Sequence, residues 1–219
     1  MIRNILIITW VLFTTSVVAQ DTAEDLYKTA KAFDAADNLE KAIEFYTKTI
    51  EADPTFENAY YNRGMLLIYT EQFPGAIRDL NHILINAPSD YEALFHRSDC
   101  YYLMKQNDSA LIDLSKAIEL NPDYIEAFKS RYYIYYENKE YIKAQKDIER
   151  LIALSYLSPE IYFHLAYCRE QEGDLDNSLQ HLNTAIEGGY TTSTAYHNRG
   201  TILTLLKKYS IAILDFEKA

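Results

Sequence analysis

Apolar and small residues recur along the chain in a repeat of 34 positions, which runs from Ala23 to Ala219 without an insertion or a deletion. Within each repeat these residues fall at positions 4, 8 and 11, and again at positions 20, 24 and 27 or 28. Steps of three and four residues place each set on one face of a helix, so every repeat predicts two amphipathic helices. The repeats are 23–56, 57–90, 91–124, 125–158, 159–192 and 193–219.

The residues that end the helices fit the same interpretation. Position 32 holds Pro54, Pro88 and Pro122 in the first three repeats, and proline cannot continue a helix. In the fifth repeat, Gly188-Gly189 can end the second helix instead. A fixed period of this length is typical of a solenoid, in which each repeat buries its apolar face against its neighbours.

The second repeat carries Tyr60, Gly64, Ala76, Leu80 and Pro88 at characteristic positions. The third repeat adds Leu94, Tyr101, Ala110, Leu114, Ala117 and Pro122. In register over essentially the whole chain after residue 19, this pattern resembles the tetratricopeptide repeat family. The resemblance implies an all-α fold over residues 20–219, a right-handed superhelical solenoid of antiparallel helix pairs with a concave groove lined by the first helices. The fourth repeat departs from the pattern, because Tyr132 stands at position 8, where small residues predominate.

Residues 1–19 do not belong to the repeats. Arg3 is followed by an apolar stretch from Ile5 to Phe13, and small residues lead up to Ala19. This is the pattern of a signal peptide cleaved after Ala19, so we expect an exported protein, periplasmic or secreted, with no membrane insertion after cleavage. The alternative is an uncleaved N-terminal segment that tethers the protein to a membrane, although the apolar run is short of the ~20 residues that a span needs.

The acidic composition excludes some classes of partner. The formal net charge is −11, and removal of Arg3 with the signal would leave 20 basic and 32 acidic residues. Such a balance disfavours nucleic acid and anionic membrane surfaces, which both attract lysine and arginine patches. Cys100 and Cys168 both occupy position 10, two repeats apart. Helices packed about 8–10 Å apart would hold them too far apart for a disulfide.

Arginine at position 7 and aspartate at position 23 occur together or not at all. Both are present in the second, third, fourth and sixth repeats and both are missing in the first and fifth. A guanidinium and a carboxylate can pair through two parallel hydrogen bonds, so the co-occurrence predicts structural ion pairs between the two helices of a repeat. The alternative is an arginine ladder that binds acidic ligands. The predicted pairs are Arg63–Asp79, Arg97–Asp113, Arg131–Asp147 and Arg199–Asp215.

The sequence offers little for catalysis. It contains no glycine-rich phosphate loop, no serine nucleophile motif and no paired CxxC metal motif. His96 with Cys100, and His164 with Cys168, have the spacing of two metal ligands on one helix face, but a zinc site needs three or four ligands. We therefore expect neither an enzyme nor a bound metal or cofactor.

The resemblance places positions 5, 9 and 12 on the groove, which then becomes rich in tyrosine and phenylalanine. Tyrosine combines a large contact area with a hydroxyl group, which suits recognition of a protein or peptide. The alternative is that several rings only pack against the next helix. The expected partner-binding residues are Tyr61, Met65, Phe95, Asp99, Tyr102, Lys129, Tyr133, Tyr136, Phe163, Tyr167 and Glu170.

Some members of the family clamp a C-terminal carboxylate with a lysine at position 5 and an asparagine at position 9. Here Lys129 is followed by Tyr133, and position 9 has no asparagine, so this mode of binding is not carried over. An extended peptide with a basic group near Asp99 or Glu170 fits better.

The sequence thus favours an exported, non-enzymatic scaffold that holds a partner protein or peptide in an aromatic groove. The alternative function is a structural component that self-associates. The last repeat ends within its second helix, so Leu203, Leu206 and Ile213 are expected to be partly uncovered. Such a surface favours homo-oligomers joined through the last repeat.

Overall fold

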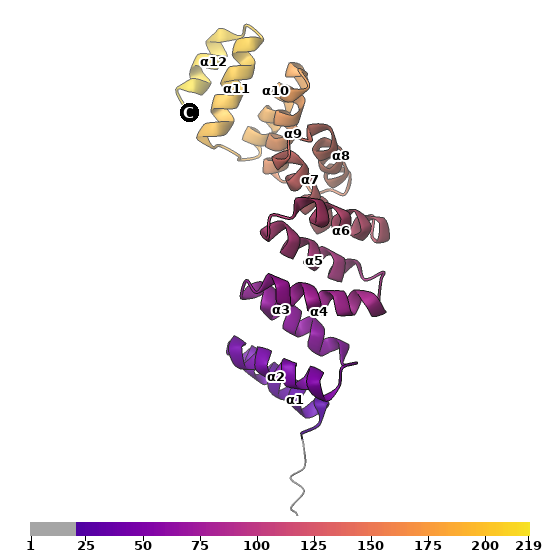
Figure 1. Cartoon of the computed structure of the whole chain (residues 1–219). Coiled ribbons are helices and arrows are strands. Elements are labelled where there is room, and N and C mark those ends of the chain that lie inside the picture. The colour runs from indigo at the N-terminus through magenta and orange to yellow at the C-terminus, as the bar shows by residue number, and fades with distance from the viewer. Residues whose placement is uncertain (1–20) are drawn as a thin grey trace, which may run out of the picture. The chain divides into compact units, whose positions relative to one another are not determined.

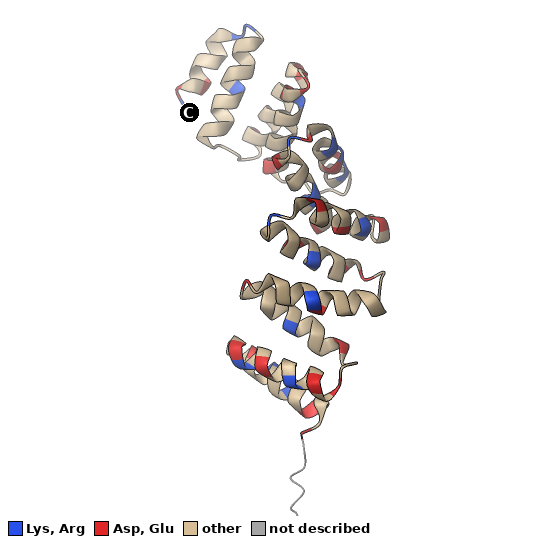
Figure 2. Cartoon of the chain, viewed as in Figure 1, with Lys and Arg blue, Asp and Glu red and all other residues tan. Residues whose placement is uncertain are grey.

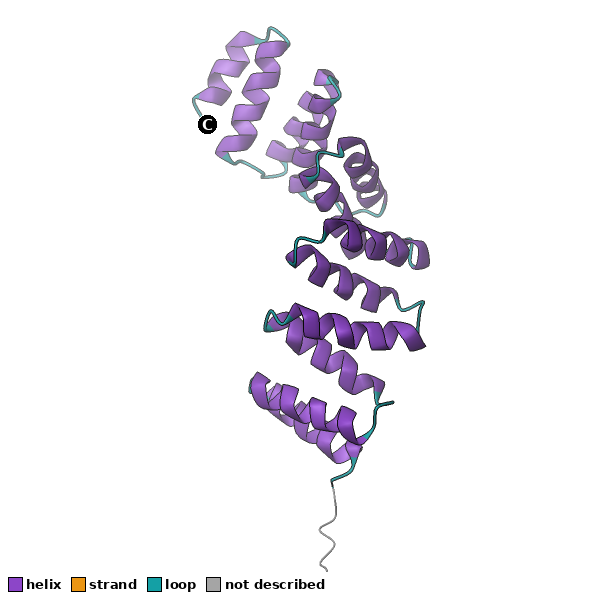
Figure 3. Ribbon diagram, in the orientation of Figure 1, coloured by secondary structure: helices purple, strands orange, loops and turns teal. Residues whose placement is uncertain are grey.

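The computed structural model describes residues 21–219, and these residues form α-helices joined by short turns, with no strand among them (Figures 1 and 3). The fold class predicted from the sequence, an all-α solenoid of helix pairs, is confirmed. The helices are α1 (Ala23–Ala35), α2 (Leu39–Ala52), α3 (Glu57–Tyr69), α4 (Phe73–Asn86), α5 (Tyr91–Leu103), α6 (Asn107–Leu120), α7 (Ile125–Glu137), α8 (Tyr141–Ala153), α9 (Pro159–Gln171), α10 (Leu175–Glu187), α11 (Ser193–Leu205) and α12 (Tyr209–Phe216).

The chain divides into two compact units, and the boundary in the sequence falls between Ala59 and Tyr60. In the first unit, α1 packs against α2. The ring of Tyr27 lies 4.8 Å from that of Phe56, centre to centre, and Tyr46 is fully buried. The oxygen of Thr22 accepts a hydrogen bond from the backbone N–H of Asp25 and so caps the start of α1.

In the second unit, each first helix packs against the second helix of its own repeat: α5 on α6, α7 on α8, α9 on α10 and α11 on α12. Successive pairs are joined because the second helix of one repeat contacts the first helix of the next, as α4 does with α5 and α6 with α7. This arrangement buries the apolar face of each helix against its neighbours. All predicted groove residues and ion pairs belong to this unit.

Small residues at position 20 explain how closely the helices of a pair approach. Ala76, Ala110, Ala144 and Ser178 have no exposed surface. A larger side chain at this position would force the two backbones apart, because the interior is already closely packed. The small position thus fixes the packing within each repeat.

The turn within every repeat places position 15 in the left-handed backbone region, which the sequence pattern did not predict. Lys105, for example, has φ of 62°, and the backbone N–H of Gln106 donates to the carbonyl of Tyr101 at 2.8 Å. This bonding ends a helix by satisfying its last carbonyls. In the other repeats, position 15 holds Asp37, Glu71, Lys139, Gly173 and Lys207.

The second helices of the fourth and fifth repeats end without proline. Ser155 (φ 63°) and Gly189 (φ 104°) adopt the left-handed conformation just after α8 and α10. Gly189 thus supplies the stop that the sequence suggested, whereas Ser155 does so without glycine's freedom.

Charged side chains are unevenly distributed. In Figure 2 they crowd α1 and α2, whereas α11 and α12 carry few. None of the helices within residues 21–219 combines the length and apolar character that a membrane crossing requires. The predicted signal peptide, residues 1–19, lies outside the described residues.

Candidate binding groove

The arginines at position 7 are held by the aspartates sixteen residues later. In the third repeat, Arg97 donates from Nε to Oδ2 of Asp113 and from Nη2 to Oδ1, both at 2.7 Å. Asp113 is 4% exposed, and Arg97 is half-buried, so the pair is largely shielded from water. The pairs predicted in the second, fourth and sixth repeats have the same two hydrogen bonds, at 2.7–2.8 Å. With their charges compensated, these arginines are not available as a ladder for acidic ligands.

The arginines of the third, fourth and sixth repeats also reach back to the preceding repeat. Arg97 donates from Nη1 to Oδ1 of Asn81 at 2.6 Å, and Arg199 donates to Asn183 at 3.0 Å. In the fourth repeat, Arg131 donates to Ser115 at 3.2 Å. The acceptor stands at position 25 each time, so one guanidinium joins two repeats. The sequence interpretation missed this link, although polar residues at position 25 were a signal for it.

The fifth repeat replaces this arrangement. Leu165 and His181 stand where the arginine and aspartate are found elsewhere. Position 25 of the fourth repeat is Glu149, and it accepts a hydrogen bond from Arg169 at 3.0 Å. Leu165 is buried in an apolar cluster with Tyr132. The polar link between repeats is therefore moved one helical turn along α9, and apolar packing fills its usual place.

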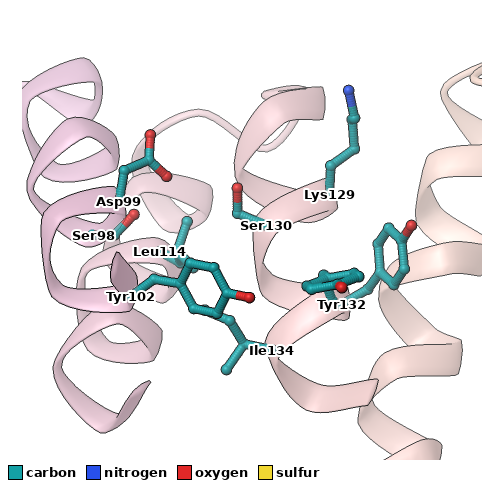
Figure 4. A pocket seen from close by; sticks show the side chains of 9 residues that line it. Ser98, Asp99, Tyr102, Leu114, Lys129, Ser130, Tyr132 and Ile134 are labelled. Atoms are coloured by element: carbon teal, nitrogen blue, oxygen red, sulfur yellow. The ribbon is translucent and has the colours of Figure 1, made fainter. Parts of the chain in front are cut away.

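A pocket of about 250 Å³ lies between α5 and α7, in the middle of the predicted groove. Figure 4 shows Asp99 and Tyr102 on one side of it and Lys129 and Ser130 on the other. Apolar side chains form its inner wall. The remaining lining residues are Ser98, Leu114, Tyr132, Tyr133 and Ile134.

The carboxyl group of Asp99 is the unusual group in this pocket. It is half-buried, and it forms no hydrogen bond or ion pair within residues 21–219. Burial alone raises the pKa of Asp99 to about 7, because the charged form loses water without gaining a partner. Such a group in a concave site is typical of a binding site.

The other charged and aromatic groups of the pocket have partners. Nζ of Lys129 lies 5.1 Å from the centre of the Tyr156 ring. The hydroxyl of Tyr102 donates to Glu137 at 3.0 Å, which links α5 to the end of α7. The rings of Tyr102 and Tyr133 meet edge to face, with centres 6.4 Å apart. Four of the residues predicted for the groove therefore lie together at one site in the structure. They are Asp99, Tyr102, Lys129 and Tyr133.

A second group of rings lies between α7 and α9. Tyr136 is 5.4 Å from Tyr167 and 4.7 Å from His164, centre to centre. Tyr141, which the sequence interpretation did not include, lies 5.6 Å from Tyr167. Burial is the main reason that the pKa of Tyr136 is raised and that of His164 is lowered, so both stay neutral near pH 7.

The other expected residues are placed as follows. Tyr61 meets His96 edge to face at 6.3 Å, and Phe95 packs against the ring of Tyr124 at 5.2 Å. Met65 is half-buried on α3 and does not line the pocket. Glu170 is half-buried on α9, and burial raises its pKa.

Phe163 requires a correction. It is 7% exposed and belongs to the core around α9 and α10, where its ring lies 4.9 Å from that of Tyr190. This packing buries the ring, so Phe163 is part of the core and not of the surface that a partner would contact. The repeat pattern did not predict this contact, because Tyr190 occupies a position that holds proline in the first three repeats.

The two cysteines are free and buried. Burial raises the pKa of Cys100 to about 11 and that of Cys168 to about 12, so both thiols stay protonated. His164 uses Nδ1 in a hydrogen bond with the hydroxyl of Tyr132, 3.3 Å away. The cysteines therefore pack as small apolar groups.

Comparison with known proteins decides the family. Models of the tetratricopeptide repeat match residues 26–55, 91–124 and 133–191, more than half of the chain together. The chain belongs to the tetratricopeptide repeat family. The match over 91–124 coincides with the third predicted repeat.

Several known proteins resemble this one at low identity. The DnaJ protein P58IPK homolog of Arabidopsis thaliana is 26% identical over 218 residues, which cover 90% of this chain and 44% of that protein. Hsp70-Hsp90 organizing protein 3 of the same plant is 24% identical over 143 residues, covering 65% and 25%. The chain therefore spans less than half the length of these relatives. The solved structure of YrrB superposes with a TM-score of 0.70 at 19% identity, covering 81% of this chain and 91% of that one.

The last repeat of this tetratricopeptide repeat protein differs in part from the expectation. Leu203 is buried, since it packs inside the repeat, and Leu206 is half-buried. Ile213 is exposed, together with other apolar side chains of α12. These are Tyr209, Ile211, Leu214 and Phe216.

Proposed function

We propose that this protein is an exported scaffold that binds an extended segment of a partner protein or peptide between its first helices, without catalysing a reaction. The observation that carries the proposal is the pocket between α5 and α7, where an unpaired carboxyl group lies beside the half-buried ring of Tyr102 and the exposed ring of Tyr133. Tyr133 is 41% exposed, although a large ring normally gains by being buried. A bound segment would cover it.

The relatives support the coarser part of the proposal. Tetratricopeptide repeat proteins generally bind proteins or peptides, and one relative is named as an organizer of Hsp70 and Hsp90. YrrB is described as a TPR protein with an unusual peptide-binding site. These properties belong to those proteins, and they make peptide binding the first function to test here.

The polar contacts argue for an internal segment of a partner rather than its C-terminal carboxylate. The ammonium of Lys129 lies over the Tyr156 ring, and the half-buried Asp99 would repel a second carboxylate. An extended peptide instead offers backbone groups to the tyrosine hydroxyls and side chains to the pocket.

The test is selection of random peptides, with both termini blocked, on residues 20–219, followed by affinity measurement with the strongest binders. A Tyr102→Ala/Tyr133→Ala variant runs beside the unchanged protein. We expect its affinity to fall at least tenfold, because aromatic anchors dominate such interfaces.

An Ile112→Ala/Tyr209→Ala variant is the matched control. It also removes two exposed apolar side chains, but from α6 and α12, outside the first helices. Equal losses in the two variants, with both folded, would move the binding surface away from the pocket. Failure to select any peptide would contradict the proposed function itself.

Export is a separate part of the proposal and rests on residues 1–19 alone. Expression of the full chain in a Gram-negative host should yield a periplasmic protein whose intact mass corresponds to a start at Gln20. A full-length chain in the membrane fraction would instead support the tethered alternative.

Self-association is the second candidate function. The exposed apolar side chains of α12, in a region with few charges, favour it (Figure 2). The proposal predicts a mass in solution that rises with concentration and returns to the monomer in an Ile213→Glu variant. A constant monomer mass would exclude it.

A further inference from the structure

The pocket between α5 and α7 contains one group whose charge nothing in the described chain balances. Asp99 stands among tyrosine rings, serines and apolar side chains, and no donor or cation is recorded in contact with it within residues 21–219. A half-buried carboxyl group without a partner is costly. A ligand that supplies a hydrogen-bond donor or a positive charge to this carboxyl group would offset the cost.

The cations nearest in sequence and in the pocket are engaged elsewhere. Arg97 is held by Asp113 and Asn81. Nζ of Lys129 lies over the Tyr156 ring, and Figure 4 shows this side chain rising away from Asp99. Any counter-ion for Asp99 must therefore come from outside the described chain.

The walls of the pocket also suit a cation. Tyr102 and Tyr133 line the pocket, and the face of an aromatic ring attracts a positive group, as it already does between Lys105 and Tyr102 at 5.5 Å. Leu114 and Ile134 can cover the methylene groups of a long side chain.

We infer that this pocket takes the lysine or arginine side chain of a bound peptide, with Asp99 as its counter-ion and Tyr102 and Tyr133 as flanking rings. The inference rests on the proposed function and specifies the peptide. At about 250 Å³ the pocket is below the usual size for a drug-sized ligand or cofactor, and it accommodates a single side chain. The raised pKa of Asp99 is consistent with a carboxyl group that awaits a cation.

The test compares the unchanged protein with Asp99→Asn, which keeps the shape of the side chain and removes its charge. The probes are random blocked peptides selected at pH 8 on residues 20–219. We expect the unchanged protein to enrich lysine or arginine at one peptide position and Asp99→Asn to lose that preference while still binding peptides through its rings.

A double-mutant cycle then measures the contact directly. The selected basic residue of the best peptide is replaced by citrulline or glutamine, its uncharged counterparts. This replacement should lower the affinity of the unchanged protein about tenfold and that of Asp99→Asn very little. Asp176→Asn on α10 is the matched control, because Asp176 is exposed and does not line the pocket.

The outcomes separate the two proposals. Peptides that bind the groove without a basic preference, or a basic preference that survives in Asp99→Asn, overturn the inference and leave the proposed function in place. If no peptide binds the folded protein, the proposed function fails and the inference fails with it.

Discussion

The hydroxyl of Tyr132 lies 3.3 Å from Nδ1 of His164, and this buried hydrogen bond joins the fourth repeat to the fifth. It stands beside Leu165, where an arginine would otherwise link the two repeats. The large side chain at the small position 8 is therefore matched to a change in the next repeat. Tyr132 fills the space and supplies a polar contact of its own.

Tyr132→Phe should lower the free energy of unfolding by about 1–2 kcal/mol, because it leaves Nδ1 of His164 without its buried partner. Denaturant unfolding measures the change. Tyr133→Phe is the control, since Tyr133 is exposed and its loss of a hydroxyl should be nearly neutral. Equal effects of the two substitutions would contradict this account.

Asp113→Ala should destabilise the protein by about 1–3 kcal/mol, because it leaves the half-buried guanidinium of Arg97 without its main partner. The thermal midpoint records the loss. Arg97→Met/Asp113→Leu, which removes both charges, should recover much of it. A midpoint unchanged by Asp113→Ala would show that the ion pair contributes nothing to folding.

Asp99→Asn, unlike Asp113→Ala, should stabilise the protein at pH 8. The unfolded carboxyl has a pKa of about 3.9, and the folded one has a pKa of about 7. Between these values the folded chain holds the extra proton, so its free energy of unfolding falls as the pH rises from about 4 to 7. Removing the carboxylate should gain roughly 1–4 kcal/mol at pH 8 and much less at pH 5. Urea unfolding at both pH values tests this; a gain that does not depend on pH would contradict it.

The affinity for a basic peptide should rise with pH around 7, as Asp99 loses its proton and becomes the counter-ion. Fluorescence anisotropy between pH 5.5 and 8.5 measures this, with Asp99→Asn as the flat reference. The other titratable groups around Asp99 are Lys129, Cys100 and the nearby tyrosines. Burial raises the pKa values of Cys100 to about 11 and of Tyr102 and Tyr124 to about 12, so these groups keep their protons in this range. A peptide affinity that falls with pH would contradict the assignment.

Gly64→Ala should stabilise the protein by about 0.5–1 kcal/mol, because alanine favours a helix and its methyl group would meet Cβ of Asp79 at an ordinary 3.5 Å. Gly200→Ala should gain less or lose stability, since its methyl group would come within 2.7 Å of the Phe216 ring. Thermal unfolding of the two variants compares them. A larger gain at Gly200 would show that Phe216 moves freely.

The fold was predictable because the same pattern of residues recurs in successive repeats, and each repeat indicates the same pair of helices. Small residues at position 20 and paired charges at positions 7 and 23 each recur, so a single unusual residue hardly weakens the inference. The left-handed residues at position 15 were not predictable, because mostly charged side chains occupy a conformation that usually marks glycine. There the two packed helices impose the turn.

The site was only partly predictable, for a related reason. Position in the repeat identified Asp99 and Tyr102, since helical spacing decides which face a residue lies on. Whether a ring is exposed depends on its neighbours in three dimensions. Phe163 is covered by Tyr190 and Tyr133 is not covered, and the repeat position alone cannot distinguish them.

The arginine at position 7 links the second repeat to the third, the third to the fourth and the fifth to the sixth. Between the fourth and fifth repeats, apolar packing around Leu165 takes that place, and the arginine link is moved to Arg169 and Glu149. These two kinds of contact respond differently to temperature, because the hydrophobic contribution weakens on cooling. The junction between α8 and α9, which has apolar packing where the others have a position 7 arginine, should therefore loosen more on cooling than the junctions of α4 with α5, α6 with α7 and α10 with α11.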